Sequence, residues 1–175
     1  HWLTGIGRRV ATEIRRIIAE DLFTETLRGG GITAAENESR VVLYGQIDGR
    51  NIFLTADAGL KALGAAVSYG TAVGLQFGTA LNVFQVPHHG SRNNISPTLL
   101  NRIVGNVSGF GTRSSIGCVI SAGPDDETHP RQVVVNALIR RGLEPQDTKR
   151  GILLFNHGVP NRQGFGPAQT LRFAT

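Results

Sequence analysis

The chain contains no methionine and only one cysteine. A single cysteine cannot form an internal disulfide, and Cys118 lies in an apolar run that is typical of a buried small hydrophobic side chain. No stretch approaches the roughly 18 consecutive apolar residues of a membrane span, and no signal peptide is evident. We therefore expect a cytoplasmic protein without a membrane segment. Because the chain starts at His1 and lacks methionine, we also expect it to be a piece of something longer.

Acidic residues are few relative to basic ones. The sequence has 13 Asp and Glu against 18 Lys and Arg, which gives a formal net charge of +5. This balance favours acidic partners such as nucleic acid, although the basic residues are spread along the chain and form no continuous stripe. With 175 residues, of which 40% are hydrophobic and 18% charged, the chain has the size and composition of one globular domain over residues 1–175.

Hydrophobic periodicity predicts an α/β (α+β) protein in which strands alternate with helices. Asp48-Gly49 between two apolar runs is a strong hairpin signal, because both turn positions tolerate positive φ. Ser96-Pro97 is typical of a helix start. The ranges predicted as helices are 7–23, 58–69, 98–104 and 131–141, and those predicted as strands are 41–47, 51–56, 81–86, 116–121 and 151–155. We expect a polar loop over 33–39 and a glycine-rich connector over 70–78.

Polar residues follow the ends of two predicted strands and precede a predicted helix. Asp57 comes after the second strand of the hairpin, His88 and His89 come after the next strand, and His129 stands at the start of a helix. Open α/β sheets build their sites at such strand ends, and imidazole and carboxylate groups are common metal ligands. Simpler interpretations are a turn with two exposed histidines, and helix N-caps for Asp57 and His129. His157 has no comparable setting, and we interpret it as structural.

Five short segments carry a resemblance to a known family. They are Asn37-Glu38-Ser39-Arg40, Thr55-Ala56-Asp57, His88-His89-Gly90-Ser91, Ser121-Ala122-Gly123 and His129-Pro130. In this order and spacing they resemble the C-terminal half of a metallo-β-lactamase-fold domain, above all the hydrolase domain of the competence DNA-uptake protein ComEC and its soluble relatives. The resemblance covers residues 36–155. Two positions depart from the family pattern, since Arg40 replaces the usual serine and Ala56 replaces the usual glycine.

The resemblance implies half of an αββα sandwich with one or two divalent metal ions, Zn²⁺ or Mn²⁺, at the strand ends. In that pattern Asp57 is the metal-bridging carboxylate and His88 a metal ligand. His89 either replaces His88 as the ligand, or orients it and binds substrate, because adjacent imidazoles cannot be separated from sequence. Ser91 either donates to a phosphate or shapes the turn. His129 resembles the family's late histidine, which suits contact with phosphate or catalytic protonation of a leaving group.

The family's main metal motif, H-x-[HD]-x-D-H, does not occur in this chain. A zinc site needs at least three protein ligands plus water, which Asp57 and His88 do not supply. We therefore predict a metal-dependent hydrolase, of the phosphodiesterase or nuclease class, that takes its missing ligands from an upstream half or a separate chain. Two alternatives stay open: a non-catalytic interaction or scaffold module with a degenerate metal site, and a hydrolase of esters, lactones or small phosphates.

Overall fold

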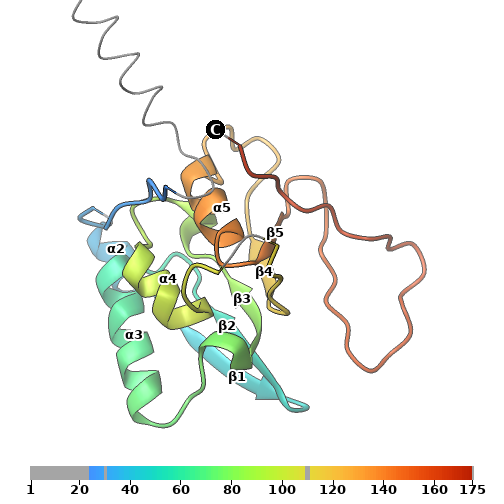
Figure 1. Cartoon of the computed structure of the whole chain (residues 1–175), viewed down its shortest axis with the longest axis horizontal. Coiled ribbons are helices and arrows are strands. Elements are labelled where there is room, and N and C mark those ends of the chain that lie inside the picture. Colours follow the sequence, from blue (N-terminus) through green and yellow to red (C-terminus); the bar gives the residue numbers. More distant parts are fainter. Residues whose placement is uncertain (1–23, 30, 109–110, 175) are drawn as a thin grey trace, which may run out of the picture.

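A mixed five-stranded β-sheet with helices packed on it organises the described part of the chain (Figure 1). This computed structural model describes residues 24–29, 31–108 and 111–174. The helices are α2 (Ala35–Glu38), α3 (Leu60–Ala72), α4 (Pro97–Val104) and α5 (Gln132–Ile139), with the 3-10 turns η1 (Gly78–Ala80) and η2 (His88–Gly90). The strands are β1 (Leu43–Ile47), β2 (Arg50–Leu54), β3 (Leu81–Gln85), β4 (Gly117–Ile120) and β5 (Glu144–Asp147). The α/β prediction is confirmed, and the helix predicted over 7–23 lies outside the described residues.

The strands lie across the sheet in chain order, β1-β2-β3-β4-β5. β1 and β2 form the predicted antiparallel hairpin, in which Tyr44 lies opposite Phe53. Its turn residues Asp48 and Gly49 have φ values of 49° and 73°, as a tight hairpin turn requires. The remaining neighbours, β2-β3, β3-β4 and β4-β5, are parallel. The carboxyl ends of β2, β3 and β4 therefore meet at one edge of the sheet.

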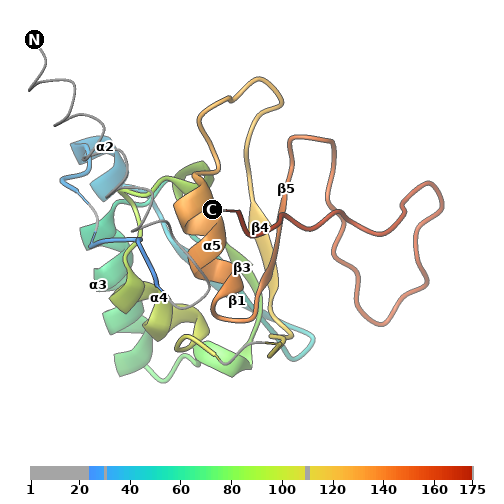
Figure 2. The same ribbon diagram turned by 45° about the horizontal axis from the view of Figure 1, so that its top comes forward.

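One buried core joins α3, α4 and α5 to a single face of the sheet (Figure 2). Phe53 on β2 and Phe84 on β3 stack there with ring centroids 6.2 Å apart. Cys118 on β4 is 1% exposed, and this burial raises the pKa of its thiol far above the ordinary value. The helices contribute Leu63, Val67, Leu100, Ile103, Val134 and Leu138, among other apolar side chains. In the stretches that the structure describes, we find no helix with the length and apolar character of a membrane span.

The opposite face of the sheet carries apolar side chains that lie largely in the open. Leu43 and Ile47 on β1 are 57% and 60% exposed, and Leu54 on β2 is 39% exposed. Successive residues of a strand point to opposite faces, so Leu54 points away from the core that holds its neighbour Phe53. The helices thus cover one face of the sheet, and the other face presents an apolar surface.

The last strand is not where the sequence predicted it. Residues 151–155 form no strand, and Phe155 lies so close to Gly117 that an added Cβ there would be 2.7 Å from its ring. The fifth strand is instead Glu144–Asp147, which pairs in parallel with β4. Its sequence is polar and contains Pro145, so it shows no hydrophobic periodicity that would predict a strand. A proline is accepted here because β5 is at the edge of the sheet.

Two predictions about the connections are also wrong. The polar stretch 33–39 contains one helical turn, α2, and is not only a loop. Helix α3 continues to Ala72, so Gly70 is a helical residue and not part of a connector. A Cβ at Gly70 would lie 3.2 Å from the ring of Phe77, so the glycine lets the following segment fold back against the helix. This return places Phe77 edge-on against Phe53, with ring centroids 5.3 Å apart.

A carboxylate from α2 caps the start of α3. The N-cap residue of α3, Gly59, has no side chain to offer. The Glu38 carboxylate accepts hydrogen bonds from the backbone N–H of Ala62 at 2.7 Å and of Lys61 at 3.4 Å, and from the Thr33 hydroxyl. The Thr33 hydrogen bond, with the two backbone hydrogen bonds, lowers the pKa of Glu38. The ionised form of Glu38 is therefore the form that stabilises the fold.

Replacing Glu38 by glutamine should lower the free energy of unfolding near neutral pH by about 1 kcal/mol, the typical contribution of a helix cap. Because folding lowers the pKa of Glu38, its contribution is present above the ordinary value of 4.5 and is lost as the pH falls through the lowered value. Urea unfolding of both proteins at about pH 7 and about pH 3 measures the difference. We expect a smaller difference in acid; an equal difference at both pH values would show that the charge is not involved.

Candidate functional site

The predicted site residues gather at the carboxyl edge of the parallel strands. Asp57 follows β2, His88 and His89 follow β3, and His129 lies between β4 and α5. The imidazole ring centroids are 5.6 Å apart for His88 and His89, 6.1 Å for His88 and His129, and 6.3 Å for His89 and His129. We call these three histidines and Asp57 the histidine cluster. Its members come from three separate loops, which the fold brings to one place.

Contact between Gly90 and Pro130 joins two of these loops. Gly90 has a φ of 81°, and a Cβ at this position would lie 2.7 Å from the Cβ of Pro130. The Gly90 carbonyl also accepts a hydrogen bond from the backbone N–H of Arg131 at 3.1 Å. The loop after β3 and the loop before α5 therefore touch without room for a larger residue. Since Arg131 is the N-cap residue of α5, the interpretation of His129 as an N-cap is wrong.

Hydrogen bonds join the loop that carries Asp57 to the loop that carries His88. The backbone N–H of His88 donates to the carbonyl of Ala56 at 2.9 Å. The Gln85 side-chain oxygen accepts from the backbone N–H groups of Thr55 and Ala56, both at 3.2 Å. Ala56 has a φ of 45°, in the left-handed region that favours glycine. A glycine would adopt this conformation without strain.

His89 is the histidine that faces Asp57. Its Nδ1 contacts the carbonyl oxygen of Ser121 and must donate, because a carbonyl only accepts. Nε2 of His89 lies 3.6 Å from Oδ1 of Asp57, while Oδ2 of Asp57 lies 4.0 Å from the guanidinium of Arg40. A different side chain therefore lies nearest to each carboxylate oxygen, His89 beside Oδ1 and Arg40 beside Oδ2. The interpretation of Asp57 as a helix N-cap is wrong, because Gly59 occupies that position of α3.

His88 is held by Asn37, a residue of the family-like segments to which the sequence assigned no role. The Asn37 side-chain nitrogen lies 3.1 Å from Nδ1 of His88, so His88 accepts here and keeps its proton on Nε2. Turning the amide over would place its oxygen against Nδ1, so that His88 donates there and has Nε2 available for a ligand. The role of His88 as a metal ligand stays a prediction, and Asn37 is the residue that would control it.

Asp126 fixes the orientation of His129. Its carboxylate accepts from the hydroxyl and the backbone N–H of Thr128, both at 2.9 Å, and from the backbone N–H of His129 at 3.0 Å. The Thr128 hydroxyl, followed by these N–H groups, holds the pKa of Asp126 well below its usual range. Oδ2 of Asp126 lies 3.1 Å from Nδ1 of His129, and an ionised carboxylate can only accept. Nδ1 therefore carries the proton, and Nε2 is the nitrogen that can exchange a proton or bind a ligand.

The sequence prediction missed Asp126, although a signal for it exists. An aspartate two residues before a threonine is typical of a turn in which the side chain accepts backbone hydrogen bonds. Asp126-Glu127-Thr128-His129 has this pattern directly before the candidate histidine. The pattern could have indicated an orienting carboxylate, because an acceptor that bonds to one ring nitrogen commonly fixes the tautomer of a functional histidine.

Ser91 and Asn94 hold the turn that follows the histidines. Ser91 is 7% exposed, and its hydroxyl accepts from the backbone N–H of Asn93 at 3.3 Å. The buried Asn94 side chain donates to the carbonyls of Asp57 and Ala58, at 3.4 Å and 3.1 Å. Asn94 thus ties this turn to the Asp57 loop, a role that nothing in the sequence indicated. These contacts support the turn-shaping interpretation of Ser91, and its contact with a phosphate stays a prediction.

The donor chemistry of the histidine cluster suits Zn²⁺ or Mn²⁺, but the arrangement is incomplete. Such ions are bound by imidazole and carboxylate groups like those of His89 and Asp57. Within residues 24–29, 31–108 and 111–174, however, no three His, Cys, Asp or Glu side chains are placed to hold a metal ion. The described residues therefore fit part of a metal site and do not complete one.

Comparison of the chain with protein-family models, with curated proteins and with solved structures finds no match. The resemblance to metallo-β-lactamase-fold hydrolases therefore rests on the five quoted segments. The geometry of the histidine cluster is the observation of this structure that bears on its function.

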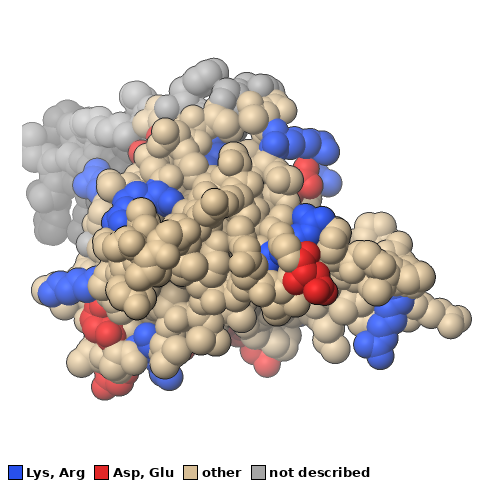
Figure 3. All heavy atoms as spheres, turned by 90° about the horizontal axis from the view of Figure 1, so that it is seen from below, with Lys and Arg blue, Asp and Glu red and all other residues tan. Residues whose placement is uncertain are grey.

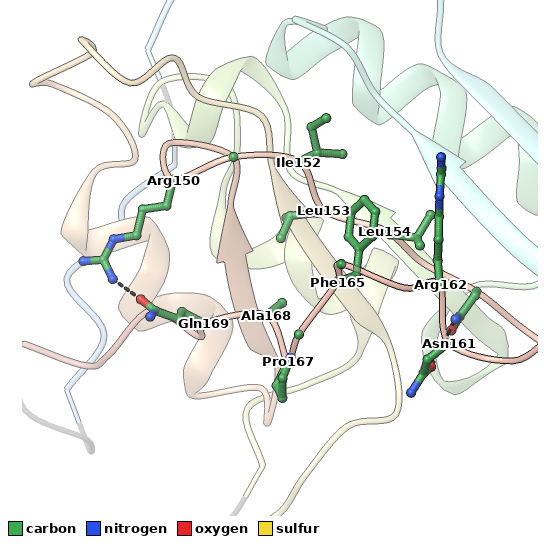
Figure 4. A pocket seen from close by; sticks show the side chains of 14 residues that line it. Arg150, Ile152, Leu153, Leu154, Asn161, Arg162, Phe165, Pro167, Ala168 and Gln169 are labelled. Carbon is green, nitrogen blue, oxygen red and sulfur yellow. Dashed lines mark hydrogen bonds between the residues drawn. The ribbon is translucent and has the colours of Figure 1, made fainter.

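A separate hollow of about 830 Å³ lies in the C-terminal segment and does not include the histidine cluster (Figure 4). Its lining residues come from 150–156 and 161–169, and most of them are exposed. Arg150 bonds to Gln169 at one side of the hollow in Figure 4. Neither the three histidines nor Asp57 lines it. We assign this hollow no part in the candidate site.

His157 also lies outside the cluster. Its two ring nitrogens are 3.0 Å and 3.1 Å from the guanidinium of Arg50, at the start of β2. With Ile52 and Phe155, both residues line a small hollow over the open face of the sheet. These contacts support the interpretation of His157 as structural.

Replacing Gly90 by alanine should lower the free energy of unfolding by about 2–4 kcal/mol. Alanine at a φ of 81° is strained, and its Cβ would overlap Pro130, so both the conformational and the packing cost apply. Thermal or urea unfolding measures the loss. Gly64→Ala in α3 is the matched control, since a Cβ at Gly64 has no neighbour within 4 Å and should stabilise the helix. Equal stability of the parent and Gly90→Ala would show that the two loops do not touch.

Replacing Ala56 by glycine should have the opposite effect and raise the free energy of unfolding by about 0.5–1 kcal/mol. The substitution removes the strain energy of a non-glycine residue at a φ of 45°. This gain exceeds the free-energy cost of the extra conformational entropy that glycine has in the unfolded chain. The melting temperature of the variant beside the parent measures the change. A lower melting temperature would mean that the backbone at this position is not left-handed.

Proposed function

We propose that this chain is the C-terminal half of a metal-dependent hydrolase of the metallo-β-lactamase fold that acts on phosphodiesters. The observation that carries the proposal is the convergence of Asp57, His88, His89 and His129 from three loops at one edge of the sheet. This edge is where open α/β sheets bind their ligands. His89 and His129 also have fixed tautomers, because Nδ1 of each donates to a supporting partner, Ser121 and Asp126 respectively. Nε2 of each is then free to bind a metal ion or to exchange a proton.

The contacts of each residue suit a separate role. Asp57 and His89 face each other and would hold a divalent ion, which when bound would polarise a phosphoryl oxygen. His129 would exchange a proton at Nε2 with the leaving oxygen, because Asp126 holds Nδ1. His88 would become a further ligand if Asn37 presents its oxygen instead of its nitrogen. The four residues thus divide into metal ligands and a proton-exchanging histidine.

A second protein layer would cover the open face of the sheet. β2, β3, β4 and β5 pair in parallel, and parallel sheets usually have both faces covered. The exposed Leu43, Ile47 and Leu54 are apolar and would pack well against another sheet. We propose that an upstream half, in the same chain or a separate one, forms this layer and supplies the missing metal ligands. The chain would then be one half of an αββα sandwich.

Nucleic acid is the phosphodiester that the charge of the chain favours. The formal net charge is +5. Lys and Arg side chains occupy several separate places on the face shown in Figure 3, with uncharged atoms and some Asp and Glu side chains between them. Such an arrangement attracts a phosphate backbone through charge and does not read a base sequence. We therefore propose a substrate class without sequence preference.

A non-catalytic interaction module is the second candidate, and Arg40 is the observation that favours it. The guanidinium of Arg40 lies 4.0 Å from Asp57, at a position where the resembled family has serine. A guanidinium beside a carboxylate balances the charge that a metal ion would otherwise balance. In this reading Asp57 is a structural partner of Arg40 and His89, and the cluster does no chemistry.

The substitution Asp57→Asn separates the two candidates. In protein that includes the proposed upstream half, the substitution should keep the fold, remove at least one metal ion and slow phosphodiester hydrolysis by on the order of a hundredfold or more. The reason is that the amide keeps the shape of the carboxylate without its charge. Elemental analysis, the melting temperature and the rate with a generic phosphodiester are measured for the variant and the parent.

Asp125→Asn is the matched control, since Asp125 is an acidic residue outside the histidine cluster. It should leave metal content and rate unchanged. Unchanged metal content and rate in Asp57→Asn as well would sink the hydrolase proposal and leave the interaction module.

A further inference from the structure

The C-terminal residues return to the body of the protein after a long exposed excursion. Residues 154–170 are exposed, form neither helix nor strand, and extend away from the sheet (Figure 1, Figure 2). Residues 171–174 then lie against α5 and β5. Leu171 packs on the buried core there, and its backbone N–H donates to the carbonyl of Pro145 at 2.8 Å. We call residues 171–174 the C-terminal strap.

Two amide side chains of α5 hold the C-terminal strap by its backbone. Nε2 of Gln132 donates to the carbonyl of Arg172 at 2.9 Å. The buried Asn136 donates to the carbonyl of Ala174 at 2.7 Å and accepts from the N–H of the same residue at 3.2 Å. Gln132 also donates to the side-chain oxygen of Asn136 at 2.8 Å, so the two amides orient each other. The strap is thus bound as an extended peptide is, mainly through main-chain groups.

The side chains of the C-terminal strap alternate as they do in a strand. Leu171 and Phe173 are half-buried, and the residues that alternate with them are exposed. The guanidinium of Arg140 lies 5.1 Å from the ring centroid of Phe173, which is a cation–π contact. Arg140 also donates to the carbonyl of Thr24, which holds its guanidinium in place. Two apolar side chains and the backbone therefore anchor the strap together.

The residues that hold the C-terminal strap support the weakest part of α5. Gln132, Asn136 and Arg140 are spaced by four and therefore share one face of the helix. In the described part of the chain no side chain caps the start of α5, whose N-cap residue is Arg131. The first N–H groups of a helix lack intrahelical acceptors, so an uncapped first turn frays easily. The bond from Gln132 to the strap thus holds the turn that follows His129.

We propose that the C-terminal strap positions the histidine cluster through the first turn of α5. The backbone N–H of Arg131, next to Gln132, donates to the Gly90 carbonyl and joins the two loops that carry His129 and His88. With the strap seated, this bond is closed and the rings are held together. When the strap leaves, the first turn of α5 frays and the bond opens. The strap acts through Arg131 and Gly90, so its residues are positioning residues.

Release of the C-terminal strap is a local event that leaves the core folded. The strap is tethered by the exposed residues 154–170, and its apolar side chains are only half-buried. Segments with few buried apolar contacts open at a lower free energy than the core does. The strap therefore links the C-terminal segment to the geometry of the candidate site. The inference concerns how the cluster is held and goes beyond the chemistry proposed for it.

Amide hydrogen exchange of the full chain, followed by NMR, tests the link at the backbone N–H of Arg131. Gln132→Glu removes the donor to Arg172, while a negative charge in the first turn of a helix is itself favourable. Exchange at Arg131 should nevertheless become about tenfold faster, because the strap is released. Phe173→Ser removes the ring from Arg140 and should have the same effect. Phe173→Tyr keeps the ring and should exchange like the parent.

The ring signals of the cluster separate positioning from a general loss of stability. Phe173 packs beside Arg140, at the opposite end of α5 from His129. The ring signals of His88 and His129 should still move in Phe173→Ser, because the cluster rearranges within the folded molecule. A variant that is only less stable keeps the spectrum of the folded parent, since its folded molecules are unchanged.

Phe165→Ser is the matched control, because Phe165 lies in the exposed loop before the strap, with Arg162 5.7 Å from its ring centroid. It should leave the exchange at Arg131 and the ring signals as in the parent. Melting curves establish that each variant is folded. Unchanged exchange at Arg131 in either Gln132→Glu or Phe173→Ser would overturn the inference. Faster exchange with unmoved ring signals would overturn it as well, by showing that the strap stabilises the fold without positioning the cluster.

Discussion

The close contact of Gly90 with Pro130 is the constraint on which the candidate site depends. Two loops that belong to different strands meet there with no space for a side chain between them, and a backbone hydrogen bond from Arg131 to Gly90 holds them in place. This contact brings together the loops that carry His88 and His129, whose rings lie close to each other. The loop of Asp57 joins them through separate hydrogen bonds, from His88 to Ala56 and from Asn94 to Asp57. The cluster is therefore built by the backbones, and its side chains need few contacts with one another.

The sequence predicted the elements whose own residues determine them. The β1-β2 hairpin follows from Asp48-Gly49, and α4 begins where Ser96 and Pro97 indicate, with the Ser96 hydroxyl accepting from the backbone N–H of Leu99 at 3.2 Å. The prediction failed where a neighbouring strand, and not the segment's own residues, determines whether the segment forms a strand. Glu144–Asp147 becomes a strand because β4 offers it hydrogen bonds, although its residues are polar. The apolar run 151–155 resembled a strand, but it forms none. The side chain of Phe155 instead packs against Gly117 of β4.

The same distinction applies to the site. Asp57, His88, His89 and His129 were predicted because each follows a recognisable strand or precedes a helix. Their supporting residues could not be predicted, because support depends on distance in space. Asn37 reaches His88 across 51 positions of the chain, and Asn94 reaches the Asp57 loop across 37. The sequence also could not tell which of the two neighbouring histidines faces Asp57, because both have a positive φ. The contact of His89 with the carbonyl of Ser121, a residue distant in the sequence, turns its ring toward the carboxylate.

Cys118 gives the protein a practical property. It is the only cysteine of the chain, it is 1% exposed, and burial keeps its thiol protonated. A thiol in this state reacts slowly with alkylating reagents, because the thiolate is the reactive species. Cys118 should therefore react little with thiol-directed labels in the folded protein. One cysteine introduced at an exposed position would carry a single spin label or fluorophore, and a pair of such cysteines would allow distances within the molecule to be measured without first removing a residue from the core.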